Sequence, residues 1–203
     1  MKLYFSPGAC SLAPHILLNE AGYSYETEKV DLAAKKTASG GDFFAINPKG
    51  YVPAIALDDG QLVTEVQVIL RYLADQKPQS GLMPKPGTME RVRAEEWLNF
   101  IASEMHKSYG PIFRPTTPEE YKTLSRAYIA RRLAILEKQL AGNQYVLGDK
   151  FSAADAYAFT ILRWSGFTKV DLTPFPSIVA YMARMEARPK VQQTLKEEGL
   201  LGK

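Results

Sequence analysis

The stretch that decides the fold is Lys2-Leu3-Tyr4-Phe5-Ser6-Pro7-Gly8-Ala9-Cys10-Ser11. Lys2–Phe5 is short, apolar and aromatic, and Ser6-Pro7-Gly8 ends it, so the pattern predicts a buried strand followed by a tight turn. Apolar residues then recur at helical spacing over Ser11–Leu18, which predicts a helix directly after the turn. The only cysteine, Cys10, therefore lies among the unpaired N–H groups of a helix start.

Cys10 has two interpretations. Ser11 is the expected cap of the helix, and the positive end of the helix dipole favours a thiolate at Cys10. A lone cysteine is alternatively a small buried side chain without reactivity. Because strand-to-helix turns are common places for bound anions and thiolates, the local pattern leaves both interpretations open.

Length and composition exclude several classes of protein. The chain has 203 residues, of which 46% are hydrophobic and 23% charged, as is typical of a globular protein with one large or two small domains. A single cysteine excludes an internal disulfide, and we see no leader and no apolar run of 18 residues, so we expect a cytoplasmic protein without membrane association. The net charge of +3, without basic blocks interleaved with aromatic residues, argues against nucleic-acid binding.

The first 76 residues predict a mixed sheet with helices on its faces. The expected strands are Lys2–Phe5, Tyr25–Val30, Ala54–Leu57 and Gln61–Val63, and the expected helices begin at Ser11, Asp42 and Thr64. Lys2–Phe5 and Tyr25–Val30 flank a helix and should be parallel. The polar stretch Asp31–Gly41 is expected to be a loop, and Thr64-Glu65-Val66-Gln67 has the form of a capping box.

The rest of the chain predicts a helical domain. Three prolines and two glycines within Lys77–Thr88 indicate a linker over 77–87, which divides a domain over 1–76 from one over 88–203. Helices are expected from Thr88 to about Ser108, over Pro118–Leu140 with Leu124, Ile129, Leu133, Leu136 and Leu140 recurring, over Phe151–Trp164, and after Pro176 and Pro189. Ser152-Ala153-Ala154-Asp155 has the form of a capping box for a buried helix.

This organisation resembles the glutathione S-transferases, and in detail their bacterial beta class. The segments that carry the resemblance are Tyr4–Ser11, Asn47–Pro53, Leu62–Glu65, Trp97–Phe100, Glu104–Lys107 and Phe151–Tyr157. It implies a thioredoxin-like α/β domain that binds glutathione, an all-α domain with a pocket for an electrophile, and a cytosolic homodimer. Glutathione is the implied substrate, and no metal is implied.

The resemblance implies roles for residues of the first domain. Ala9 and Cys10 would lie beside the glutathione sulfur, and Cys10 would form a mixed disulfide with it. Lys35 would reach the glycine carboxylate while Lys36 stays at the surface. Without the resemblance, a solvated position on a polar loop is an equally good interpretation of either lysine. Val52, before a proline expected to be cis, would pair its backbone with the cysteinyl part of glutathione.

Further roles fall on the start of one helix and the face of another. Glu65 would take the γ-glutamyl ammonium, and the N–H of Val66 would take the carboxylate, although the family usually has Ser or Gly at position 66. Asn99, Ser103 and His106 share a helical face by spacing, which the resemblance places across from the thiol, with His106 steadying the glutathione thiolate. A polar solvated stripe is the alternative for these three residues.

The aromatic residues of the helical domain and the second histidine complete the candidate residues. The aromatic residues Tyr109, Phe113, Trp164 and Phe167 are core residues or the wall of a substrate pocket. His15 is expected to be structural or exposed.

The implied function is glutathione conjugation of hydrophobic electrophiles in detoxification, together with glutathione-dependent disulfide or peroxide reduction by Cys10. Two alternatives remain open from the sequence: a non-catalytic interaction module such as the RNA polymerase-associated regulators of this fold, and a reductive dehalogenase of aromatics. Retention of Cys10, Lys35 and Glu65 favours an enzyme, and Val66 argues on the other side. The sequence does not identify the electrophile.

Overall fold

A computed structural model describes residues 1–201 as two compact units. One unit consists of Met1–Leu82 and the segment from Ala187 onward, and the other of Met83–Glu186. The sequence assigns 88–203 to a single helical domain, whose last two residues lie outside the described ones, whereas the segment from Ala187 belongs to the first unit. The predicted boundaries at 76 and 88 stay predictions.

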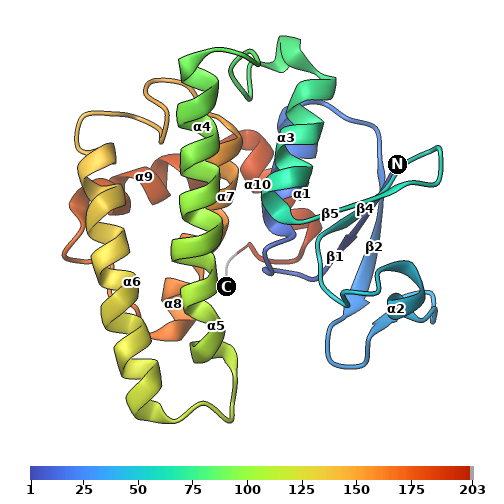
Figure 1. Cartoon of the computed structure of the whole chain (residues 1–203), viewed down its shortest axis with the longest axis horizontal. Helices are drawn as coiled ribbons and strands as arrows, with labels where there is room; N and C mark the ends of the chain where they lie inside the picture. Colours follow the sequence, from blue (N-terminus) through green and yellow to red (C-terminus); the bar gives the residue numbers. More distant parts are fainter. Residues whose placement is uncertain (202–203) are drawn as a thin grey trace. The chain divides into compact units, whose positions relative to one another are not determined.

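Figure 1 shows the elements of each unit in chain order. The first unit contains β1 (Lys2–Phe5), α1 (Leu12–Glu20), β2 (Glu26–Asp31), β3 (Lys36–Thr37), α2 (Phe43–Ile46), β4 (Ala54–Ala56), β5 (Leu62–Thr64), α3 (Val66–Gln76), the 3-10 turn η1 (Pro78–Ser80) and α10 (Pro189–Glu197). The second contains α4 (Met89–Phe100), the π-helical segment η2 (Ile101–His106), α5 (Lys107–Phe113), α6 (Glu119–Leu140), α7 (Ala153–Arg163), α8 (Ser165–Thr168) and α9 (Pro176–Glu186).

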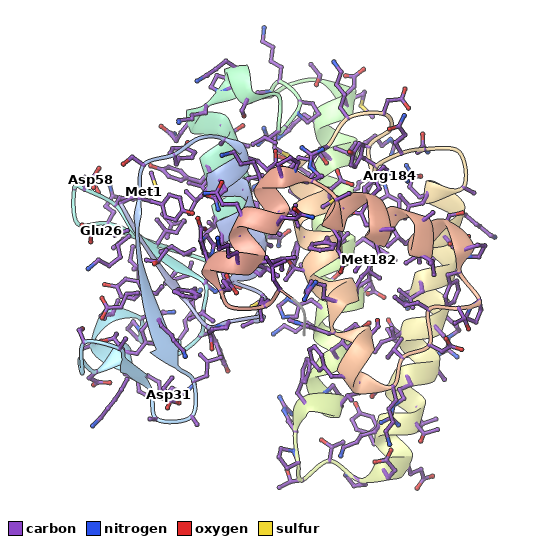
Figure 2. All side chains as sticks on the ribbon, turned by 180° about the vertical axis from the view of Figure 1, so that it is seen from behind. Met1, Glu26, Asp31, Asp58, Met182 and Arg184 are labelled. Carbon is purple, nitrogen blue, oxygen red and sulfur yellow. The ribbon has the colours of Figure 1, made fainter. Side chains whose placement is uncertain are left out.

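The first unit is built on a mixed sheet of five strands in the order β3-β2-β1-β4-β5. β1 pairs in parallel with β2, as predicted, and antiparallel with β4, which forms the predicted hairpin with β5. β3 lies inside the stretch that the sequence predicts to be a loop. The sequence does not indicate this strand, because a pair of residues is too short to show strand periodicity. The amino group of Met1 lies 2.5 Å from Asp58 in the turn of the hairpin (Figure 2).

The two faces of this sheet bury different sets of side chains. Tyr4, Val30, Val52 and Ala54 form one apolar cluster with Phe43 of α2. Because side chains alternate along a strand, the fully buried Leu3 and Ile55 point to the opposite face. In this unit α1 packs against both α3 and α10.

Buried polar contacts fasten the C-terminal segment to α1 and to the turn before it. The Glu198 side chain has no exposed surface, and its Oε2 accepts a hydrogen bond of 2.9 Å from the Gly8 N–H. Its Oε1 lies 2.8 Å from Nδ1 of His15. Of the two expectations for His15, structural or exposed, the structure supports the structural one. Asn19 donates to Thr194 at 2.9 Å on the same helix pair.

Three expected caps are present. Asp42 accepts from the Phe44 N–H and Thr88 from the Arg91 N–H, and Ser152 and Asp155 form the predicted capping box. The predicted box at Thr64 is wrong, because Thr64 is the last residue of β5 and α3 starts only after Glu65.

Ser11 precedes α1 but makes no capping hydrogen bond, which corrects the expected cap. Its hydroxyl is used instead within the preceding turn: it accepts from the Ser6 N–H at 3.1 Å and donates to the Ser6 carbonyl at 3.2 Å.

The second unit is a helical bundle around α7, which is buried along most of its length as predicted. The stripe predicted on α6 is buried at Ile129, Leu133, Leu136 and Leu140, but Leu124 is 60% exposed and Ser125 is buried in its place. α6 packs against η2 and α5, and Figure 1 shows α6 beside α5. No helix within residues 1–201 is long and apolar enough to cross a membrane.

Asp155 organises the start of α7. Its carboxylate accepts hydrogen bonds of 2.8 Å from both the Val146 N–H and the Ser152 N–H, and one of 2.6 Å from the Ser152 hydroxyl. Burial raises the pKa of Asp155 to about 6, against these donors, which lower it.

Replacement of Glu198 tests how much its buried contacts with Gly8 and His15 contribute to stability. Glu198→Ala is expected to lower the free energy of unfolding by about 3 kcal/mol, because a buried acceptor for Gly8 and His15 is lost. Urea unfolding at pH 7 measures the change. The matched control is Glu197→Ala, since Glu197 also lies beside His15 but is 39% exposed; it should cost about 1 kcal/mol or less. Equal losses of unfolding free energy in the two variants would contradict the importance of the buried Glu198 contacts.

The pKa of Asp155 predicts a pH effect on stability. Because this pKa is raised from 3.8 to about 6, the folded protein binds more protons at Asp155 than the unfolded chain does between those values. The group therefore makes the free energy of unfolding decrease as the pH rises from about 4 to about 6. Asp155→Asn should be less stable at every pH and should lack this contribution. Urea unfolding across that pH range compares the two proteins, and identical pH slopes would refute the assignment.

Candidate functional site

The turn between β1 and α1 presents Cys10. Besides the two hydrogen bonds between Ser6 and Ser11, the Ala9 N–H donates to the Ser6 carbonyl at 3.0 Å. Gly8 has φ +71°, a conformation that side chains rarely adopt, so a glycine suits this position. Hydrogen bonds thus hold the turn before Cys10, whose side chain is partly exposed.

The thiol of Cys10 contacts the backbone of the segment before β4. Its Sγ donates a hydrogen bond of 3.2 Å to the carbonyl oxygen of Val52. The Val52–Pro53 peptide bond is cis, as expected. A thiolate has no proton to donate, so this contact belongs to the protonated form of Cys10, and ionisation or a ligand that takes the Val52 carbonyl releases the sulfur.

The two neighbouring lysines differ in surroundings. The Nζ of Lys35 donates to the Gly50 carbonyl at 2.8 Å and lies 5.7 Å from the centre of the Tyr51 ring. Its backbone has φ +56°, which turns the chain into β3. Lys36 is exposed within β3. Lys35 thus carries its charge close to the Val52 segment.

Charged residues gather where β5 passes into α3. Glu65 has φ +70° and lies directly before α3, whose first turn has no side-chain cap. The Nζ of Lys49 lies 2.7 Å from Oε1 of Glu65 and 3.0 Å from the Thr64 hydroxyl. Val66 is 6% exposed, so its apolar side chain belongs to the core and the position offers a ligand only its backbone.

In the second unit, Asn99, Ser103 and His106 lie on a stretch that is not a continuous α-helix. η2 is π-helical from Ile101 to His106, and its hydrogen bonds connect residues five apart, whereas the predicted shared face takes α-helical spacing throughout; that face therefore stays a prediction. Asn99 and Ser103 are exposed, and the Ser103 hydroxyl donates to the Asn99 carbonyl at 2.9 Å.

His106 is half-buried against α7. Its Nδ1 lies 2.7 Å from the Tyr157 hydroxyl, and its ring lies 5.0 Å from that of Trp164, edge to face. The hydrogen bond to Tyr157 fixes the orientation of the His106 ring against α7.

The four predicted aromatic residues form one cluster. The rings of Tyr109 and Phe113 lie 5.5 and 5.0 Å from that of Trp164, and Phe167 lies 6.0 Å from Phe113. Tyr109 and Trp164 are buried, whereas Phe113 and Phe167 are 43% and 66% exposed. Burial raises the pKa of Tyr109 to about 12. The cluster is therefore core at one end and an apolar surface at the other.

Sequence reasoning missed three partners of these residues: Lys49 beside Glu65, Tyr157 beside His106, and Glu198 beside Gly8. No local pattern points to the last two, which lie far from their partners in the chain. Within residues 1–201 no three His, Cys, Asp or Glu side chains are grouped so that they could hold a metal ion.

A thioredoxin-like sheet with a cysteine before its first helix, together with a helical bundle, is the arrangement that the resemblance to the glutathione S-transferases implies. The chain matches the family models "Glutathione S-transferase, N-terminal domain" over residues 8–76 and "Glutathione S-transferase, C-terminal domain" over residues 100–189. It is 47% identical to glutathione S-transferase GstA of Escherichia coli O157:H7, over 98% of this chain and 100% of that one.

Solved structures agree with these matches. A sphingomonad glutathione S-transferase complexed with glutathione is 46% identical with a TM-score of 0.95, over 98% of this chain and 100% of that one. A beta-class enzyme from Sphingomonas chungbukensis is 44% identical with a TM-score of 0.96, over 99% and 100%. The chain belongs to the glutathione S-transferase family, as its sequence resemblance predicts.

Proposed function

We propose that this protein is a beta-class glutathione transferase that binds glutathione beside Cys10 and transfers its sulfur to hydrophobic electrophiles. The observation that carries the proposal is the contact of the Cys10 thiol with the Val52 carbonyl. A peptide that pairs with Val52 as an added strand would bring its own cysteine to the place that Cys10 marks. The glutathione in the sphingomonad relative supports the choice of ligand.

The charged groups of the first unit suit the rest of glutathione. Lys35 would exchange the Gly50 carbonyl for the glycine carboxylate, a stronger charge-assisted partner. Glu65 would take the γ-glutamyl ammonium, and the uncapped start of α3 at Val66 would take the carboxylate. Ala9 would contact the cysteinyl part beside Cys10. For Asn99, Ser103 and His106 of the second unit, the roles in binding that the resemblance implies stay predictions.

Two reactions follow from the chemistry of sulfur. In conjugation, the glutathione thiolate attacks an electrophilic carbon, a C–S bond forms, and the bond to the leaving group breaks; the resemblance gives His106 the role of steadying the thiolate. In disulfide reduction, the Cys10 thiolate attacks a mixed disulfide of glutathione, keeps the glutathionyl sulfur and releases the other thiolate. A glutathione thiolate then attacks this intermediate, which gives oxidised glutathione and restores Cys10.

Peroxide reduction would use the same cysteine. The Cys10 thiolate attacks the peroxide, the O–O bond breaks to release an alcohol, and the resulting sulfenic acid condenses with glutathione to a mixed disulfide and water. We also propose that the protein works in the cytoplasm as a homodimer in detoxification, as the resemblance implies.

The activity assay separates the two reactions. Wild-type protein should accelerate both the reaction of glutathione with an activated aryl chloride and glutathione-dependent reduction of hydroxyethyl disulfide. Cys10→Ala should lose disulfide reduction by at least 100-fold but keep conjugation within about tenfold, because only the first reaction uses Cys10 covalently. Cys10→Ser is the matched control, as it keeps a hydroxyl donor for Val52 but cannot form the intermediate.

Three outcomes would overturn or redirect the proposal. Loss of both reactions in Cys10→Ser would refute the division of roles. Absence of both in folded wild-type protein would refute the transferase function and favour an interaction module. Formation of the hydrogen-substituted arene together with oxidised glutathione, instead of the conjugate, would indicate reductive dehalogenation.

A further inference from the structure

An exposed ion pair lies where the proposed site would hold the γ-glutamyl end of glutathione. Lys49 follows α2, and Glu65 lies directly before α3, yet their charged atoms are 2.7 Å apart. The Nζ of Lys49 also donates to the Thr64 hydroxyl at 3.0 Å. Both side chains are more than half exposed, at 51% and 60%, so a ligand can reach them.

The stability of the fold does not explain this pair. Ion pairs at such exposed positions contribute little to folding. Glu65 moreover has φ +70°, a conformation that residues other than glycine rarely adopt. Such backbone strain is common at ligand-binding positions, where it aims a side chain.

The γ-glutamyl group of glutathione carries an ammonium and a carboxylate on one carbon atom. A cation beside an anion is the complement of this zwitterion. Position 66, however, offers the carboxylate only a backbone N–H, because Val66 is apolar and its side chain is buried. The long, flexible stem of Lys49 allows its ammonium to move from Glu65 to a neighbouring carboxylate.

We infer that Lys49 and Glu65 together recognise the γ-glutamyl zwitterion, with Lys49 binding the carboxylate that Val66 cannot hold through a side chain. This inference rests on the proposed function. On binding, the ion pair opens, Glu65 takes the ammonium and Lys49 takes the carboxylate, so one ion pair is exchanged for two. Lys49 is thus a residue that determines specificity for the γ-glutamyl end.

Calorimetry with two ligands tests the inference. The ligands are glutathione and 4-aminobutyryl-cysteinyl-glycine, which keeps the ammonium and lacks the α-carboxylate. Lys49→Gln should raise the Kd for glutathione about fivefold to tenfold and change the Kd for the analogue by no more than twofold. Lys36→Gln, which removes an exposed lysine of β3, is the matched control and should leave both values unchanged. Val66→Ser in the Lys49→Gln background should restore part of the glutathione affinity.

The remaining outcomes are each informative. Unchanged or tighter glutathione binding by Lys49→Gln would overturn the inference and make Lys49 a mere competitor for Glu65. Equal losses for both ligands would also overturn it, because the carboxylate would then be irrelevant. If wild-type protein binds no glutathione, the proposed function fails, whereas binding by the wild type with no selective loss in Lys49→Gln removes the inference alone.

Discussion

The hydrogen bond from the Gly8 N–H to the buried carboxylate of Glu198 fixes the turn on which the site depends. The same carboxylate contacts His15 of α1, so the turn and the helix are fastened to one point of the C-terminal segment. Ser11 closes the turn from within through Ser6. The position of Cys10 is therefore set by contacts that do not belong to ligand binding, which keeps the thiol in place before any substrate arrives.

The polar groups of the proposed glutathione site already have partners. Cys10 contacts the Val52 carbonyl, Lys35 the Gly50 carbonyl, and Glu65 the ammonium of Lys49. Binding must exchange these contacts for those of the ligand, so only the difference between the two sets contributes to affinity. Such a site gains selectivity from the pattern of its charges. A ligand that replaces only some of these contacts breaks the others without forming new ones, and therefore binds more weakly.

Local patterns sufficed for much of the fold. The parallel strands around α1, the hairpin after Pro53 and the capping box at Asp155 all depend on neighbours in the chain, and the sequence predicted them. It could not predict the contact of His15 with Glu198, the π-helical turn before His106 or the use of Thr64 in a strand, because these depend on long-range packing. The candidate residues came from family resemblance, whereas their partners Lys49 and Tyr157 came from the structure.

The central claim is that Cys10 is held as a reactive thiol beside the glutathione sulfur. The most direct measurement is the rate at which glutathione disulfide modifies the reduced protein, followed by intact mass and compared with the same chain unfolded in urea. The account predicts one glutathionyl group on Cys10, absent from Cys10→Ala, formed at least tenfold faster in the folded protein and removed by excess glutathione. Modification that is no faster in the folded protein than in the unfolded chain would contradict the claim.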